Sequence, residues 1–259
     1  MILNFKIDDE HYVEYNESTK DYDFFFKKEL IPNKINNLFK YYNSNINSID
    51  SLLNSYFYLA NPSSFNDPFD SNKNLVVDFD SKDSEIKKNN YEDIGICSFC
   101  EDINHPIMWA HYTNNYRGFA VEFDTENFKL QIEKNQFKGS EINEGFQIAK
   151  VIYVNYIVPI QKAFKFHKRY LFATKGKYWQ VEKEWRIIGE LNSKARINRK
   201  LYFDPEIVKN IYLGFNLCNE DETAVNLIAT ICQIKYPKAE IFIVGPDSKK
   251  LTLAKQKLI

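Results

Sequence analysis

The sequence predicts a single α+β domain over residues 36–259, with residues 1–35 as an N-terminal appendage packed on this core. A chain of 259 residues, 44% of them hydrophobic, can bury roughly 70 to 75% of its unfolded surface. No internal repeat and no linker rich in Pro, Gly or Ser divides the chain. Strand and helix patterns are mixed along it, which indicates helices packed on one sheet.

The first elements are short and rich in aromatic residues. Alternation over residues 2–7 predicts a strand, and the run at residues 38–42 predicts a second one. Residues 46–54 place apolar side chains at helical spacing and predict a helix, with Ser48 as the candidate N-cap. A strand over residues 56–60 follows.

The middle of the chain alternates between apolar elements and polar stretches. Two polar excursions, residues 71–93 and 125–145, show no periodic pattern. Between and after them we expect a short helix with Pro in its first turn and four strands. The helix spans residues 106–112, and the strands span residues 94–99, 118–123, 149–158 and 184–189.

The tail has the most regular pattern. A strand over residues 211–215, a helix over residues 221–234 and a strand over residues 240–244 follow one another. This order predicts a right-handed crossover between two parallel strands.

Charge and composition exclude several classes of protein. The 34 basic and 35 acidic residues leave no basic excess for nonspecific nucleic-acid binding. No run of 18 apolar residues exists, and the N-terminus does not have the pattern of a secretory signal. Four cysteines in a chain of this length do not form a disulfide framework. We therefore expect a cytoplasmic protein with no membrane partner.

Two cysteines and two histidines superficially resemble a zinc-ligand set: Cys97, Cys100, His105 and His111. Residues three apart on a strand face opposite sides, however, and no second closely spaced cysteine pair exists. We therefore expect buried thiols and no metal.

Two segments admit a structural and a functional interpretation. Residues 64–70 can form an Asx turn, or Asn66 or Asp67 can line the mouth of a pocket. Trp109 and Tyr112 share a helical face, where they can pack in the core or offer flat surfaces to a ring-shaped ligand.

Glu182 and Glu184 are the candidate catalytic residues. On an extended chain their side chains share one face, with Cα atoms roughly 6.5 to 7 Å apart, while Trp185 anchors the other face. Two such carboxylates can stabilise positive charge in a substrate and accept a proton from a nucleophile. The alternative is a solvent-facing acidic pair on an amphipathic strand.

Several motifs, taken in order, resemble the bacterial domain of unknown function 2971 family over residues 37–245. They are Phe39-Lys40-Tyr41, Tyr58 to Pro62, Phe65 to Asp70, Cys97-Ser98-Phe99, Met108 to Tyr112 with Gly118, and Glu182 to Arg186. The family name implies no reaction.

The same order of elements more distantly resembles the ADP-ribosyltransferase fold. That resemblance implies a bent or split mixed β-sheet flanked by helices, with strands 56–60 and 184–189 bordering a cleft that binds NAD. It implies that Glu184 stabilises the ribose cation and that Glu182 serves the acceptor. It implies that Lys40 and Tyr41 hold NAD and that Trp109 or Tyr112 stacks on the nicotinamide. Asn66, in the turn after strand 56–60, is a further candidate for NAD binding.

Two hypotheses follow. The first is an NAD-consuming ADP-ribosyltransferase or NAD glycohydrolase, with NAD as a substrate and a protein or nucleic acid as the acceptor. The resemblance suggests a toxin or phage-defence effector, with a cognate inhibitor or defence partner. The second is a noncatalytic binding or interaction domain of a defence system, in which Glu184 and Arg186 form a buried ion pair.

Overall fold

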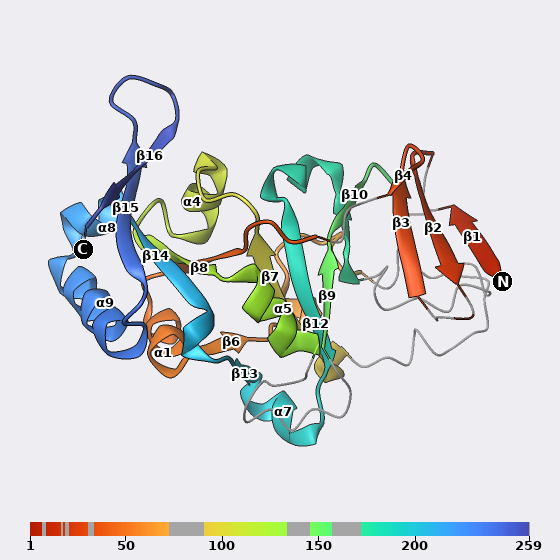
Figure 1. Ribbon diagram of the computed structural model, residues 1–259, viewed down its shortest axis with the longest axis horizontal. Coiled ribbons are helices and arrows are strands. Elements are labelled where there is room, and N and C mark those ends of the chain that lie inside the picture. Colours follow the sequence, from red (N-terminus) through yellow and green to blue (C-terminus); the bar gives the residue numbers. More distant parts are fainter. Residues whose placement is uncertain are drawn as a thin grey trace.

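The computed structural model shows a mixed α+β protein built on one large sheet (Figure 1). It describes residues 1–6, 9–16, 18, 21–30, 34–72, 91–133, 146–156 and 172–258. The predicted α+β class with a mixed sheet and flanking helices is confirmed. No helix in these ranges combines the length and the apolar character needed to span a membrane.

The large sheet has eight strands in the order β16-β15-β14-β8-β5-β7-β12-β9. Only β14 and β15 pair in parallel, and the other neighbours are antiparallel. The strands are β5 (Phe39–Asn43), β7 (Ile94–Cys100), β8 (Gly118–Phe123), β9 (Gln147–Lys150), β12 (Glu184–Glu190), β14 (Val208–Gly214), β15 (Glu240–Pro246) and β16 (Leu253–Lys257).

Helices and three small sheets complete the described part of the molecule. The α-helices are α1 (Ile46–Asn54), α4 (Pro106–Tyr112), α5 (Thr125–Glu133), α7 (Ser193–Asn198), α8 (Phe215–Glu220) and α9 (Glu222–Lys235). The 3-10 helices are η1 (Pro62–Ser64), η2 (Tyr91–Asp93), η3 (Lys177–Glu182) and η4 (Pro205–Ile207). Short strand pairs join β6 (Tyr56–Tyr58) to β13 (Lys200–Tyr202) and β10 (Ile152–Val154) to β11 (Thr174–Gly176).

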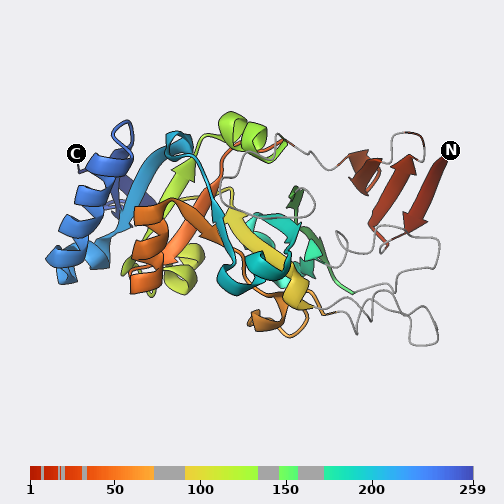
Figure 2. The ribbon, with the colours of Figure 1, turned by 90° about the horizontal axis from the view of Figure 1, so that it is seen from below.

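The N-terminal residues form a sheet of their own. It consists of β1 (Ile2–Lys6), β2 (His11–Asn16), β3 (Asp21–Phe26) and β4 (Glu29–Leu30). This sheet and α9 lie at opposite ends of the molecule (Figures 1 and 2). The Asp9 amide donates to the Tyr156 hydroxyl at 3.1 Å, one of the contacts that join the small sheet to the rest. The proposed division at residue 35 stays a prediction.

The centre of the large sheet is buried on both faces, whereas its edge strand β16 is largely exposed. Along β8, Phe119, Val121 and Phe123 point into the main apolar core, which also contains buried side chains of α1, α5 and α9. Ala120 points the other way, into a smaller cluster around Trp109 of α4. This pattern follows from the two-residue period of a strand.

The sheet opens between its fifth and sixth strands. Strand β5 pairs with β8 through all five of its residues, from Phe39 opposite Glu122 to Asn43 opposite Gly118. With β7 it shares only the pair of Phe39 and Cys100. Beyond this pair the two strands separate, and the side chains between them line a pocket.

The tail confirms the predicted strand, helix and parallel strand. Ile211 of β14 pairs with Ile241 of β15, and the two strands are parallel. Helix α9 begins where the Asp221 side chain accepts a hydrogen bond from the Ala224 amide at 2.9 Å. Its buried residues include Ile228 and Ile231, which hold it against the sheet.

Three local predictions were wrong. The cap of α1 is Asn45, not Ser48, because the Asn45 side chain accepts from the Ser48 amide at 2.9 Å. Helix α5 lies in the stretch expected to be irregular, held by buried Phe128 and Ile132. The strand expected over residues 149–158 is divided into β9 and β10 at Val151. Most of the excursions, residues 73–90 and 134–145, lie outside the described residues.

Candidate functional site

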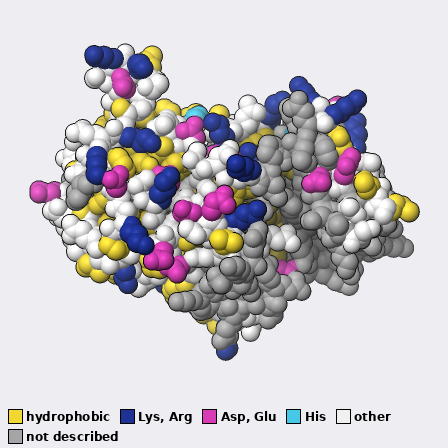
Figure 3. Space-filling view, viewed as in Figure 1, with side chains coloured by type: hydrophobic (Ala, Val, Ile, Leu, Met, Phe, Trp, Pro, Cys, Tyr) yellow, Lys and Arg dark blue, Asp and Glu magenta, His cyan; other side chains and the backbone are white. Residues whose placement is uncertain are grey.

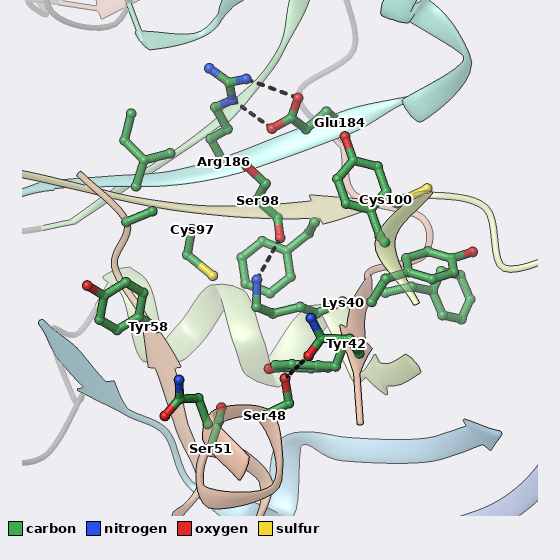
Figure 4. Close-up of a pocket in the computed structure, with 18 of the residues that line it drawn as sticks. Lys40, Tyr42, Ser48, Ser51, Tyr58, Cys97, Ser98, Cys100, Glu184 and Arg186 are labelled. Carbon is green, nitrogen blue, oxygen red and sulfur yellow. Dashed lines mark hydrogen bonds and ion pairs between the residues drawn. The ribbon is translucent and has the colours of Figure 1, made fainter. Parts of the chain in front are cut away.

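A pocket of about 650 Å³ occupies the opening between β5 and β7. This volume is within the range of small-molecule sites, which is roughly 300 to 1,000 Å³. Its walls come from β5, β6, β7, β11, β12, the end of η3, α4, the N-terminal half of α1 and the turn that follows η1. Figure 4 shows Glu184 and Arg186 at one side of this pocket, Lys40 near its middle, and Ser48 and Ser51 at the opposite side.

One wall contains a buried network around Arg186 of β12. Its Nε donates to Glu184 Oε1 at 2.7 Å, and its Nη2 donates to Glu184 Oε2 at 3.1 Å. The same guanidinium binds both oxygens of Asp70, at 2.8 and 2.6 Å. Arg186 is 1% exposed. A buried guanidinium that binds two carboxylates in this bidentate manner fixes their positions.

Glu182 reaches the same wall by a different route from the predicted extended strand. It ends η3, and Lys183 then adopts a left-handed conformation with φ 44° before β12 begins at Glu184. Glu182 is 3% exposed, so the acidic pair is not solvent-facing. Its Oε1 accepts from the Tyr112 hydroxyl at 2.5 Å, and its Oε2 accepts from Lys175 Nζ at 2.6 Å.

The two glutamates differ in ionisation. Burial alone would raise the pKa of Glu184, but the positive charges of Arg186 and Lys175 outweigh it and lower the pKa to about 2. For Glu182, burial and the negative charge of Glu184 raise the pKa, against the opposing effect of Lys175. Glu184 therefore stays ionised at neutral pH, while Glu182 can exchange a proton closer to neutrality.

Lys40 of β5 projects into the middle of the pocket. Its Nζ donates to the Ser98 carbonyl oxygen at 3.2 Å and lies 5.4 and 5.5 Å from the ring centres of Tyr42 and Phe99. Among the described residues, no carboxylate lies within ion-pairing distance of Lys40. This lysine therefore offers a positive charge to a ligand, unlike Arg186, which is already paired.

The aromatic residues proposed to stack on a ligand divide into two groups. Tyr112 lines the pocket and points its hydroxyl at Glu182. Trp109 is fully buried: its Nε1 donates to the Ile103 carbonyl at 2.6 Å and its ring packs against Tyr41, with centres 5.3 Å apart. The proposal that Trp109 stacks on a pocket ligand is therefore wrong, because its ring is enclosed by the core.

Tyr41 and Asn66 both lie on the pocket wall. The Tyr41 hydroxyl is already used, because it donates to the Asp102 carbonyl at 2.6 Å. Asn66 is exposed and begins the turn in which Asp67 Oδ1 accepts from the Phe69 amide at 2.9 Å. The predicted Asx turn is thus present, and it places Asn66 at the mouth of the pocket.

The two cysteines of the candidate zinc-ligand set lie on β7. Cys97 and Cys100 are both buried, and burial raises the pKa of each thiol. No group of three or more His, Cys, Asp or Glu side chains able to hold a metal occurs in the part of the chain that the structure describes.

Sequence reasoning missed Lys175 and the role of Asp70. Lys175 lies on β11 with its Nζ 3.2 Å from Glu184 Oε2 and 3.8 Å from Asp70 Oδ2. Neither residue shares a predicted strand or helix with the two glutamates, so these contacts could not be inferred from the sequence. Their contacts depend on how η1, β11 and β12 pack together.

Fold and pocket define a mixed α+β protein whose central sheet opens around a charged cavity. Residues 108–187 match a family described as "Protein of unknown function (DUF2971)". The match runs from α4 into β12 and includes Tyr112, Lys175 and both glutamates, and it supports the resemblance to the domain of unknown function 2971 family. No curated protein and no solved structure matches the chain.

Proposed function

We propose that the pocket binds NAD and cleaves its bond between nicotinamide and ribose, transferring ADP-ribose to a macromolecular acceptor or to water. One observation carries the proposal: two buried glutamates lie together on one pocket wall but are held by different partners, Glu184 by Arg186 and Glu182 by Tyr112, with Lys175 bound to both. Paired carboxylates with divided roles are the usual means of cleaving a bond to the anomeric carbon of a sugar.

Glu184 is the electrostatic residue in this scheme. Departure of nicotinamide leaves positive charge on the ribose, and an ionised carboxylate at hydrogen-bond distance stabilises that charge. The low pKa of Glu184 keeps it ionised throughout. The positive charge of Arg186 partly offsets the negative charge of Glu184, but two hydrogen bonds from Arg186 hold the carboxylate in one orientation.

Glu182 is the acid–base residue. Its raised pKa suits a group that accepts a proton from the attacking hydroxyl or water and later releases it. It lies beside Glu184 but receives its hydrogen bonds from Lys175 and Tyr112. The Tyr112 hydroxyl takes no part in the two hydrogen bonds that join Arg186 to Glu184.

Lys40 supplies the charge for the rest of the dinucleotide. The two phosphates of NAD are anionic, and Lys40 is the pocket lysine without a carboxylate partner among the described residues. Tyr41, Tyr112 and Asn66 add surface and polar groups on the wall. NAD is a consumed substrate here, so a toxin or phage-defence effector would act by depleting it or by modifying a target.

A second candidate function has its own observation. Glu184 and Arg186 are 5% and 1% exposed and are fully hydrogen-bonded to each other and to Asp70 and Lys175. A noncatalytic binding or interaction domain accounts for such an ion pair as a structural element of the core. In such a noncatalytic domain the pocket would bind a ligand without converting it.

Nicotinamide release from NAD decides between the two. We expect the wild-type protein to release nicotinamide and Glu184→Gln to be slower by about 10² to 10⁴, the range for loss of a positioned electrostatic group. NAD affinity should change little, because the lost interaction is stronger in the transition state. Glu182→Gln should impair transfer to an acceptor more than hydrolysis.

Glu220→Gln is the matched control. Glu220 also pairs with an arginine, Arg117, through two hydrogen bonds, but it lies on α8 and does not line the pocket. Its variant should release nicotinamide at the wild-type rate. Thermal melts of all variants identify any that are unfolded. A folded wild-type protein without turnover would contradict NAD cleavage and favour the noncatalytic binding function. A fully active Glu184→Gln variant would exclude Glu184 as the catalytic residue.

A further inference from the structure

Lys175 occupies the centre of a carboxylate cluster formed by Asp70, Glu182 and Glu184. Its Nζ lies 2.6 Å from Glu182 Oε2, 3.2 Å from Glu184 Oε2 and 3.8 Å from Asp70 Oδ2. The side chain is 8% exposed, and its Nζ lies 4.9 Å from the ring centre of Trp179. A lysine is seldom buried this far unless its charge is paired.

The other cation of the cluster cannot substitute for it. Arg186 directs its donors at Asp70, at Glu184 and at the Phe172 carbonyl. Among the described residues, Lys175 is the cation within ion-pairing distance of Glu182. The three carboxylates and two cations leave one excess negative charge, so loss of Lys175 would leave two.

We propose that Lys175 is the positioning residue of this site, holding Glu182 and Glu184 side by side by bridging one oxygen of each. The inference deepens the proposed function, because it concerns the two glutamates that would perform it. Lys175 itself need not touch the substrate.

The bridge explains how two acidic side chains share one buried wall. Like charges a few ångströms apart disfavour each other's ionisation, and a cation between them offsets that cost. Other groups face the cluster from neighbouring elements, and among them only Tyr112 donates to Glu182. They are Tyr112 on α4, Tyr153 on β10, Cys97, Cys100 and Ser98 on β7, and Asp70 after η1.

Lys175→Met tests the bridge, since methionine fills much of the same space without a charge. We expect the melting temperature at about pH 7 to fall by about 6 to 20 °C, the loss for a broken buried pair in a chain of this size. The deficit should be smaller at an acidic pH than at neutral pH, because the pKa of Glu182 is raised and its protonation relieves the repulsion that the missing lysine leaves. Lys200→Met is the control, because Lys200 pairs with Asp50 at 3.0 Å but is 30% exposed, so its variant should melt nearly as the wild type does.

The double variant Lys175→Met/Glu182→Gln separates the charge effect from packing. Removal of the unpaired carboxylate should restore much of the melting temperature at neutral pH, and this double variant should fold even if Lys175→Met does not. A deficit that is the same at both pH values, or a double variant no more stable than Lys175→Met, would show that Lys175 only fills space and would overturn the inference.

Activity gives a second readout. In Lys175→Met the pKa of Glu182 loses its main opposing charge, so the acid limb of the pH–rate profile should move to higher pH. The melts do not require turnover. A wild-type protein that releases no nicotinamide therefore refutes the proposed function, while the two melting tests still decide the role of Lys175.

Discussion

Two arginine–glutamate pairs with similar geometry lie in different parts of the molecule, one within β12 and the other between α8 and the residue before β8. Arg186 binds Glu184 through Nε and Nη2 at 2.7 and 3.1 Å, and Arg117 binds Glu220 through the same atoms at 2.6 and 2.9 Å. The side chains of the first pair are 1% and 5% exposed, and those of the second are 41% and 47% exposed. Hydrogen-bond geometry alone therefore does not distinguish them.

Burial gives the two pairs different consequences. Water solvates each partner of the exposed pair when the other is removed, so such pairs contribute little to stability. Each partner of the buried pair depends on the other, because no solvent replaces it. On the surface that Figure 3 shows, Lys, Arg, Asp and Glu side chains are interspersed, as is typical of solvent-exposed charges.

The largest expected effect is that of Arg186→Met. It leaves the Asp70 and Glu184 carboxylates buried without their guanidinium, and we expect the free energy of unfolding to fall by about 3 to 5 kcal/mol at neutral pH. Urea denaturation at two pH values measures it. The loss should be smaller in acid, where the Glu184 carboxylate left without its guanidinium takes up a proton. A loss below about 1 kcal/mol would mean that this buried pair contributes no more than an exposed one.

An apolar truncation in the other half of the sheet should cost a similar amount for another reason. Leu213 on β14 is fully buried in the main core, and Leu213→Ala should lower the free energy of unfolding by about 2 to 5 kcal/mol. Because a cavity carries no charge, this loss should be the same at neutral and acid pH. A marked pH dependence would mean that the apolar half is coupled to the carboxylate cluster.

Acid titration of the wild-type protein tests the buried pair without removing a cation. The pKa of Glu184 is lowered from 4.5 to about 2 in the folded state, so its stabilising contribution is present above about pH 4.5 and is lost as the pH falls towards 2. This contribution is on the order of 3 kcal/mol. Glu184→Gln should lack it, whereas Glu220→Gln should retain the wild-type acid dependence; identical titration of both variants would contradict the assignment.

The smallest effect should be that of Arg117→Ala. Loss of an exposed ion pair typically changes the free energy of unfolding by about 0.2 to 1 kcal/mol, and added salt should reduce the difference further. Chemical denaturation at low and high salt measures it. A salt-independent loss of several kcal/mol would remove the contrast between the two pairs.

Elements with a clear period could be predicted from the sequence. The apolar spacing of α9 and the strand patterns of β14 and β15 placed these elements to within a few residues. Helix α5 was missed because Phe128 and Ile132 are few among polar neighbours, and only tertiary contact with the core reveals that they share a buried face. Local pattern does not report such contacts.

The site was predictable only where sequence spacing brings its residues together. Glu182 and Glu184 could be selected from spacing, and both line the pocket. Sequence could not separate Trp109 from Tyr112, because residues three apart on one helix share a direction while the depth of each depends on what packs above it. Lys175 comes from a different strand, and no spacing in the chain relates it to the glutamates it binds.

The order of strands in the large sheet has a consequence for the nascent chain. Strand β5 ends at residue 43, but its main partner β8 ends only at residue 123, and β8 in turn pairs with β14 over residues 208–214. At typical rates of translation β5 waits roughly 4 to 16 s for β8 to be synthesised. A sheet closed by such distant pairings folds slowly, on the order of milliseconds to seconds. During synthesis the Phe-Lys-Tyr-Tyr segment of β5 is therefore an exposed aromatic strand edge, which can pair with another chain until β8 covers it.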